Sequence, residues 1–82
     1  MDDMFNRIAL FRHDRGLSRR ELANAVDVNP QTIGYLERGD YKPSLELALK
    51  VAQVFDTPIE LIFSLDPFLS ITDALRGVGE RQ

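Results

Sequence analysis

Two short helical patterns separated by a two-residue turn constrain the fold of this chain more than any other feature. Residues 20–38 carry apolar side chains at helical spacing, Leu22, Ala23 and Val26 in the first pattern and Ile33 and Leu36 in the second. Asp27 and Val28 lie between them. Ala23 is small enough to let two helices approach closely, so this stretch predicts a pair of helices that cross over a tight turn.

Capping residues mark the ends of the first three predicted helices. Residues 4–15 form an amphipathic pattern that ends at Gly16. Ser18 and Glu21 have the spacing of a capping box, which begins the second helix. Asn29 followed by Pro30 begins the third in the same way, as a cap and then a proline in the first helical position. Gly39 ends that helix.

Two further helices follow the bend at residues 42–43. Ser44 caps a fourth helix that continues to Phe55, and Thr57 and Pro58 begin a short fifth helix ending near Phe63. The interiors of these helices contain no proline, and no strand-like alternation of polar and apolar residues appears. The sequence therefore predicts an all-α fold.

Composition excludes several classes of function. The 82 residues include no cysteine and one histidine, His13, so no disulfide, thiolate site or histidine-rich metal site is expected and no cofactor is implied. The chain begins Met-Asp-Asp, acidic where a secretory signal would be basic. No apolar run approaches the roughly 20 residues that cross a bilayer. We expect a cytoplasmic protein that has no contact with a membrane.

Charge is distributed unevenly along the chain. The net charge is −3, yet residues 5–42 carry seven basic and five acidic side chains. Residues 43–82 carry three basic and six acidic ones. Binding to a polyanion depends on the charges that face it, so this distribution permits a nucleic-acid partner on the N-terminal half.

The sequence resembles the phage-repressor and Cro type of helix-turn-helix domain, the XRE family, over residues 4–64. The residues that carry the resemblance are Gly16-Leu17-Ser18, Glu21-Leu22-Ala23, Val28, Gln31-Thr32-Ile33, Leu36-Glu37, Gly39, Lys42-Pro43-Ser44-Leu45 and Ile59-Glu60-Leu61-Ile62-Phe63. The resemblance implies a compact five-helix, repressor-like domain that binds double-stranded DNA. It also implies a homodimer on a palindromic operator, with the third helix reading the bases.

Two positions depart from the family pattern. Asp27 stands where the family has a glycine in the turn, and aspartate tolerates the left-handed conformation better than most residues. Arg19 stands where the family has a glutamine that approaches a phosphate, and arginine can make that contact too.

The resemblance assigns candidate DNA contacts to the third helix and its flanks. Residues expected to face base edges are Asn29, Pro30, Gln31, Thr32 and Tyr35, with Gly34 allowing close approach. Residues expected at phosphates are Arg19, Arg38, Tyr41 and Lys42. Gln31 is the best candidate for direct readout, because its amide can pair with adenine through two hydrogen bonds.

Other charged residues are expected either to stabilise the fold or to lie in solvent without a specific role. In the family, residues that match Arg12 and Glu37 form a partly buried ion pair joining the first helix to the end of the third, so a structural role is expected. His13 is expected at the surface, and Arg15 and Arg20 are expected to be solvated.

Residues 65–82 lie outside the resemblance and form a predicted C-terminal extension. Apolar residues recur there at steps of three and four, which predicts a short amphipathic helix ending at Gly77. The residues proposed as a dimer contact are Phe68, Leu69, Ile71 and Leu75. Packing of this helix against its own domain is the alternative.

Three functional classes can be compared. An enzyme has little support, because no catalytic pairing or phosphate-binding loop is found. A protein-interaction module, such as an antitoxin that binds a partner toxin, would carry exposed aliphatic residues on the third helix. The polar residues there favour a dimeric, sequence-specific transcriptional regulator that acts as a repressor. The short extension cannot enclose a small-molecule site by itself, so no small-molecule ligand is implied.

Overall fold

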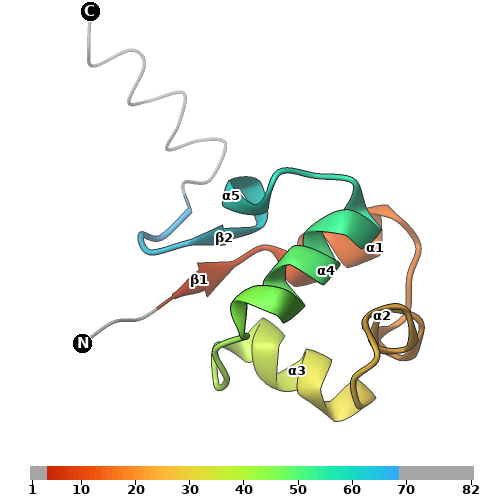
Figure 1. The fold of residues 1–82 in the computed structure, drawn as a ribbon. Coiled ribbons are helices and arrows are strands. Elements are labelled where there is room, and N and C mark those ends of the chain that lie inside the picture. The colour runs from red at the N-terminus through yellow and green to blue at the C-terminus, as the bar shows by residue number, and fades with distance from the viewer. Residues whose placement is uncertain (1–3, 69–82) are drawn as a thin grey trace, which may run out of the picture.

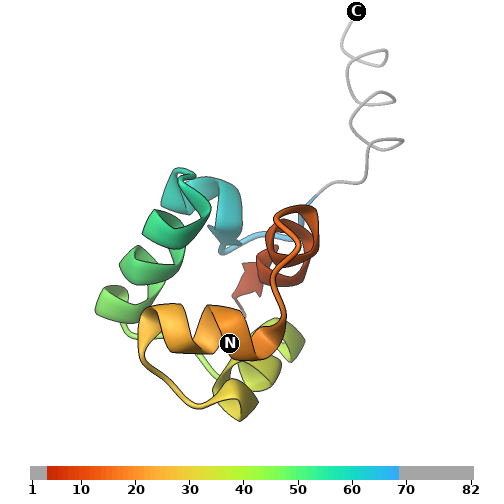
Figure 2. The ribbon, with the colours of Figure 1, turned by 90° about the vertical axis from the view of Figure 1, so that its right-hand side faces the viewer.

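The domain consists of five helices and one small sheet. The computed structural model describes residues 4–68. In chain order the elements are β1 (Phe5–Asn6), α1 (Ile8–Asp14), α2 (Arg19–Val26), α3 (Pro30–Arg38), α4 (Leu45–Phe55), α5 (Ile59–Ile62) and β2 (Phe63–Ser64). The helices surround one core, and α2 and α3 cross at the base of the domain (Figures 1 and 2). The five-helix fold expected from the sequence is confirmed, with a two-strand sheet that the all-α prediction did not include.

The start of the first helix differs from the prediction. Residues 4–7 are not helical, and Phe5 and Asn6 pair antiparallel with Ser64 and Phe63 respectively. The backbone N–H of Arg7 also donates to the carbonyl of Ile62 at 2.7 Å. A two-residue strand has no periodicity that a sequence pattern can reveal, and its partner is more than fifty residues away, so the sheet was missed. The strands lie side by side at the left in Figure 1.

The core contains the apolar residues of both predicted helical patterns. The fully buried side chains include Ile8, Leu22, Ala23, Ile33, Val51 and Ile62, with Val26, Leu36 and Phe55 at most 2% exposed. Ala23 has no side-chain atoms beyond Cβ, so α2 can pack closely within this cluster. Burial of this set holds the angle between α2 and α3, because both helices contribute to one core.

The predicted caps begin and end the helices. At α2 the Ser18 hydroxyl accepts from the backbone N–H of Glu21, whose carboxylate accepts from the backbone N–H of Ser18 at 2.8 Å. These hydrogen bonds, first to the backbone and then to the side chain of Ser18, lower the pKa of Glu21. Ser44 caps α4 through the backbone N–H of Leu47. The starts of α2 and α4 are therefore fixed by caps that the sequence specifies.

Arg15 is exposed, as expected, but it also makes contacts that the sequence did not predict. Its Nη2 donates to the carbonyl of Phe55 at 2.8 Å and to Thr57 Oγ1 at 3.2 Å. Its guanidinium also lies 5.1 Å from the centre of the Phe11 ring. Arg15 thus ties the end of α1 to the last carbonyl of α4, a contact over forty residues that no local pattern indicates.

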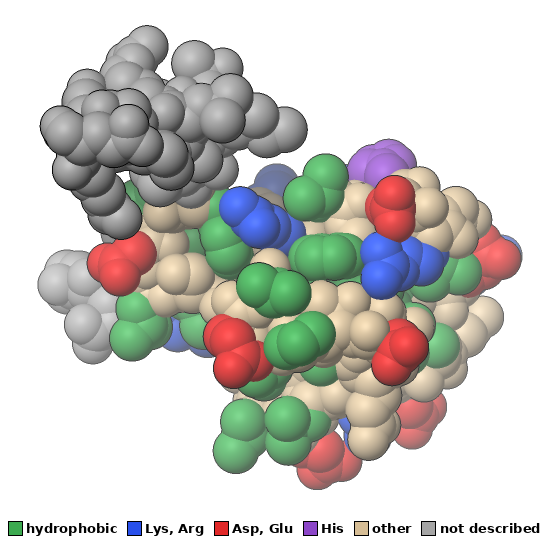
Figure 3. Space-filling model, turned by 90° about the horizontal axis from the view of Figure 1, so that it is seen from above, with side chains coloured by type: hydrophobic (Ala, Val, Ile, Leu, Met, Phe, Trp, Pro, Cys, Tyr) green, Lys and Arg blue, Asp and Glu red, His purple; other side chains and the backbone are tan. Residues whose placement is uncertain are grey.

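The face opposite α3 is mixed in character. Hydrophobic side chains there alternate with acidic and basic ones (Figure 3). No helix within residues 4–68 has the length and apolar character needed to cross a bilayer.

Candidate nucleic-acid interface

The turn between α2 and α3 is closed by Asp27 in the left-handed conformation, with φ 60° and ψ 51°. Its backbone N–H donates to the carbonyl of Ala23, and so does that of Val28, at 3.0 Å. Aspartate therefore adopts the conformation that the family assigns to glycine. The prediction that the tight turn is kept with aspartate in place of glycine is confirmed.

α3 presents a polar face to solvent and an apolar face to the core. Asn29 Oδ1 accepts from the backbone N–H of Gln31 at 2.8 Å, and Pro30 follows as the first helical residue. Ile33 and Leu36 are buried, whereas Gln31 and Tyr35 are exposed. The helix ends at Gly39, with φ 79°. Capping and burial together fix which side of α3 remains accessible.

The residues expected to face bases gather at the start and along the exposed side of α3. Asn29 and Gln31 are exposed, Pro30 and Thr32 are half-buried, and the Tyr35 side chain is 46% exposed. Because the side-chain Oδ1 of Asn29 caps the helix, the NH₂ of the same side chain is the group left to meet a ligand. The Gln31 side chain extends from the first turn of the helix. Four of the five candidates therefore lie at the start of α3, and Tyr35 lies further along its exposed side.

The residues expected at phosphates are exposed, and they lie at the start of α2, at the end of α3 and in the loop that follows α3. Tyr41 and Lys42 are exposed in the loop before α4. Arg38 is exposed as well, and its Nε donates to Asp40 Oδ2 at 3.1 Å. The Arg38 guanidinium also lies 5.1 Å from the centre of the Tyr35 ring. Asp40 was not singled out from sequence, although its spacing of two residues from Arg38 was visible.

Arg12 and Glu37 form the expected ion pair between α1 and α3. Arg12 Nε donates to Glu37 Oε2 at 2.7 Å, and the two side chains are 9% and 5% exposed. Arg12 Nη1 donates to the carbonyl of Leu17 at 3.0 Å. His13 is exposed, as expected, with its Nε2 3.3 Å from Arg12 Nη2. The pair therefore joins α1, the segment before α2, and the end of α3.

Arg19 shares the same carboxylate, a contact that the sequence did not predict. Its Nε donates to Glu37 Oε1 at 3.0 Å while its side chain remains 52% exposed. Glu37 thus accepts from one buried and one exposed arginine. The signal that could have found this pair is the Arg19 substitution itself, because the family's glutamine carries no charge to complement a glutamate.

A shallow hollow of about 330 Å³ lies between the start of α2 and the outer face of α3. Arg19, Gln31, Tyr35 and Arg38 line it, together with Pro30 and Gly34. A Cβ at Gly34 would lie 3.5 Å from Arg38 Nη1 and 4.0 Å from Arg19 Nη1. Two guanidinium groups therefore converge over the one residue of α3 that has no side chain.

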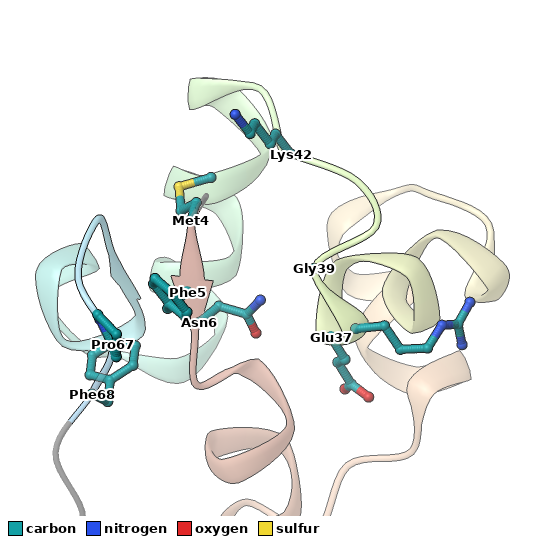
Figure 4. Close-up of a pocket in the computed structure, with 9 residues that line it drawn as sticks. Met4, Phe5, Asn6, Glu37, Gly39, Lys42, Pro67 and Phe68 are labelled. Atoms are coloured by element: carbon teal, nitrogen blue, oxygen red, sulfur yellow. The ribbon is translucent and has the colours of Figure 1, made fainter. Parts of the chain in front are cut away.

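Most of the predicted C-terminal dimer contact lies outside the described residues. Leu69, Ile71 and Leu75 belong to the part of the chain that the structure does not describe. Phe68 is half-buried, and the Arg7 guanidinium lies 4.0 Å from the centre of its ring. Pro67 and Phe68 lie on one side of β1 and Gly39 and Lys42 on the other, and together with β1 they line one cavity (Figure 4).

Comparison with known proteins places this geometry in a family. The model of the helix-turn-helix family matches residues 8–62. An HTH-type transcriptional regulator of Archaeoglobus fulgidus is 48% identical over 63 residues, covering 77% of this chain and 90% of the relative. YgzD, an HTH-type transcriptional regulator of Bacillus subtilis, is 40% identical over 63 residues, covering 77% and 96%.

A solved structure agrees with these relatives. The clp gene regulator ClgR from Corynebacterium glutamicum has 29% sequence identity and a TM-score of 0.62, with 90% of this chain and 76% of that chain covered. The comparisons do not favour the alternative of a toxin-binding module. The family match, the relatives and the fold agree, so the chain belongs to the XRE-type helix-turn-helix family of DNA-binding transcriptional regulators.

Proposed function

We propose that this regulator is a homodimeric repressor that reads a palindromic operator with α3 and acts by occlusion. The observation that carries the proposal is the outer side of α3, where polar side chains that can read bases are accessible and arginines flank them. Residues 4–64 would form the DNA-binding unit and residues 65–82 an extension that contributes to the dimer.

The distribution of exposed aliphatic residues supports DNA over a protein partner at α3. The exposed leucines of the described part are Leu10, Leu45, Leu49, Leu61 and Leu65, and none of them belongs to α3. A surface built for a partner protein would place apolar side chains at its centre. The exposed positions of α3 instead carry Gln31, Tyr35 and Arg38, which suit base edges and phosphates.

We assign base readout and phosphate contact to different residues. Gln31 and Thr32 would read bases, with Asn29, Pro30 and Tyr35 beside them in the groove. Arg19, Arg38, Tyr41 and Lys42 would contact the backbone and fix the register. Two such helices in a two-fold dimer would lie about 34 Å apart, so half-site centres would be roughly 10 base pairs apart.

Selection of bound duplexes from a random pool, followed by fluorescence anisotropy at several salt concentrations, tests the proposal. The expected winner is a palindrome with half-sites one helical turn apart, bound less tightly as salt rises. An asymmetric winner, or a monomer bound to DNA in sedimentation analysis, would remove the two-fold dimer. Absence of any enriched duplex, with binding indifferent to salt, would contradict sequence-specific DNA binding itself.

The direction of regulation needs its own measurement. A reporter gene downstream of the selected palindrome is expected to be transcribed less when the protein is supplied in vitro with purified polymerase. Increased transcription would contradict repression and leave DNA binding intact.

A further inference from the structure

We propose that Arg19 and Arg38 hold one and the same backbone phosphate of the DNA over Gly34, and that Glu37 is the positioning residue for Arg19. This inference rests on the proposed DNA binding and specifies how the phosphate is held. Such a site differs from a diffuse positive potential, because two arginines from different helices bind a single anion.

The two arginines are held in the same manner. Arg19 donates through Nε to Glu37 at 3.0 Å, and Arg38 donates through Nε to Asp40 at 3.1 Å. A guanidinium bound at Nε keeps donors on its Nη atoms for a second partner. Both Nη1 atoms lie within 4.0 Å of the position that a Cβ of Gly34 would occupy. The remaining donors of both side chains are thus concentrated at one place.

The charge balance around Glu37 leaves a positive charge at that place. Glu37 is 5% exposed and has its closer contact with Arg12, which is itself 9% exposed. The buried Arg12 therefore neutralises the carboxylate, and the charge of the half-exposed Arg19 faces solvent without a full counterion. The three groups carry two positive charges and one negative charge, so the cluster remains cationic while Glu37 orients Arg19.

Gly34 supplies the space for the anion. The hollow over it is lined by Gln31 and Tyr35 beside the two arginines, and no acidic side chain lines it. A phosphate has the oxygens to accept from two guanidinium groups at once. A side chain at position 34 would occupy the space between the two Nη1 atoms, so a glycine in the middle of α3 is explained by the approach of a ligand.

A double-mutant cycle for DNA affinity tests whether one phosphate is shared. Arg19→Ala and Arg38→Ala are each expected to weaken binding about tenfold or more, because each loses a charge-assisted hydrogen bond. The double variant is expected to lose less than the product of the single losses. Because each contact occurs twice in a two-fold dimer, it should lower the slope of log affinity against log salt by about 1.8, the value for one phosphate per half-site, whereas separate phosphates would lower it by about 3.6.

Gly34→Ala separates binding from folding. Alanine favours the helix interior over glycine, and its Cβ meets only ordinary contacts in the free protein, so the melting temperature is expected to rise. DNA affinity is expected to fall about tenfold, since the methyl group fills the phosphate position. Unchanged affinity for Gly34→Ala would overturn the placement of the anion. For Arg19→Ala and Arg38→Ala, the control for loss of one positive charge is Lys50→Ala, on α4 and paired with Glu46, which is expected to weaken binding much less.

The role of Glu37 is tested in two backgrounds. Glu37→Gln is expected to weaken DNA binding when Arg19 is present and to have no further effect in the Arg19→Ala protein. An equal effect in both backgrounds would make Glu37 a structural partner of Arg12 alone. Multiplicative losses in the arginine cycle would overturn the shared phosphate while leaving DNA binding established, and failure of the unmodified protein to bind any duplex would instead count against the proposed function.

Discussion

Arg12 is a charged side chain with almost no contact with solvent, and its neighbours explain how it is tolerated. Both Glu37 oxygens and the carbonyl of Leu17 lie within reach of its guanidinium, at 2.7 to 3.4 Å. Transfer of a charged group from water to the protein interior costs several kcal/mol unless such partners replace the water. Arg12 is therefore a residue whose loss affects the whole junction of α1, α2 and α3.

Arg12→Ala is expected to lower the free energy of unfolding by about 3 kcal/mol, because it leaves the buried Glu37 carboxylate with Arg19 as its one charged partner. Urea denaturation of the purified variants measures this change. The double variant Arg12→Met/Glu37→Met, which removes both charges and keeps apolar volume, should lose less than Arg12→Ala. A double variant that loses as much stability as Arg12→Ala, or more, would contradict the coupling of the two side chains.

Gln31 carries the prediction about specificity. Gln31→Ala is expected to cost about 1 to 3 kcal/mol at one base pair and to relax the preference there, because its amide can pair with both groups of one base edge. Anisotropy with duplexes that vary one base pair at a time measures the change. Lys42→Ala is the matched control and should weaken all duplexes alike. Uniform loss for Gln31→Ala would remove it from base readout.

At the scale of elements, the position of α2 depends on its first turn. Ser18 and Glu21 satisfy each other's backbone N–H groups, and the ionised carboxylate accepts from Ser18 more strongly than the neutral acid would. Since Arg19 is the first residue of this helix, the capping box also sets where the Arg19 side chain begins. A local pair of residues thus determines the place of a candidate DNA contact.

The lowered pKa of Glu21 predicts a pH dependence of stability. A carboxyl whose pKa is lower in the folded state stabilises the fold above its unfolded pKa, and that contribution disappears as the pH falls through the folded pKa. Thermal melts between about pH 5 and pH 3 should therefore show a smaller decrease for Glu21→Gln than for the unmodified protein. Equal decreases in melting temperature would contradict a contribution of the ionised Glu21 carboxylate to stability.

At the scale of the whole molecule, β1 and Asn6 connect the beginning of the domain to its end and to α3. Asn6 Nδ2 donates to the carbonyl of Leu36 at 2.7 Å, and Asn6 Oδ1 accepts from the backbone N–H of Ile8 at 3.0 Å. Its side chain points from β1 towards the end of α3 (Figure 4). One amide thus ties the sheet, the start of α1 and the end of α3 together.

Asn6→Ala is expected to reduce the free energy of unfolding by about 1 to 3 kcal/mol, because the N–H of Ile8 loses its acceptor and the Leu36 carbonyl keeps the N–H of Gly39 but loses the Asn6 amide. Asn6→Asp keeps the acceptor for Ile8 and loses the donor to Leu36, so its loss should be intermediate at neutral pH. Chemical denaturation followed by circular dichroism measures both. Identical losses for the two variants would mean that the contact with Leu36 carries the whole effect.

Local patterns in the sequence determined the helices and most of the candidate site. The caps at Ser18, Asn29 and Ser44 and the left-handed turn at Asp27 act within a few residues, so a sequence pattern is sufficient to predict them. The exposed side of α3 also followed from the spacing of Ile33 and Leu36. The pairing of Arg12 with Glu37 came from the family resemblance rather than from spacing.

Only the tertiary structure decided the contacts between segments distant in the chain. The pairing of β1 with β2, the contact of Arg15 with the end of α4, and the sharing of Glu37 by Arg12 and Arg19 each join different elements. The physical reason is that such contacts depend on how helices pack, and packing is a property of the whole core rather than of any short stretch. The sequence therefore specified which side chains reach solvent on α3, and the packing specified which arginines converge beside it.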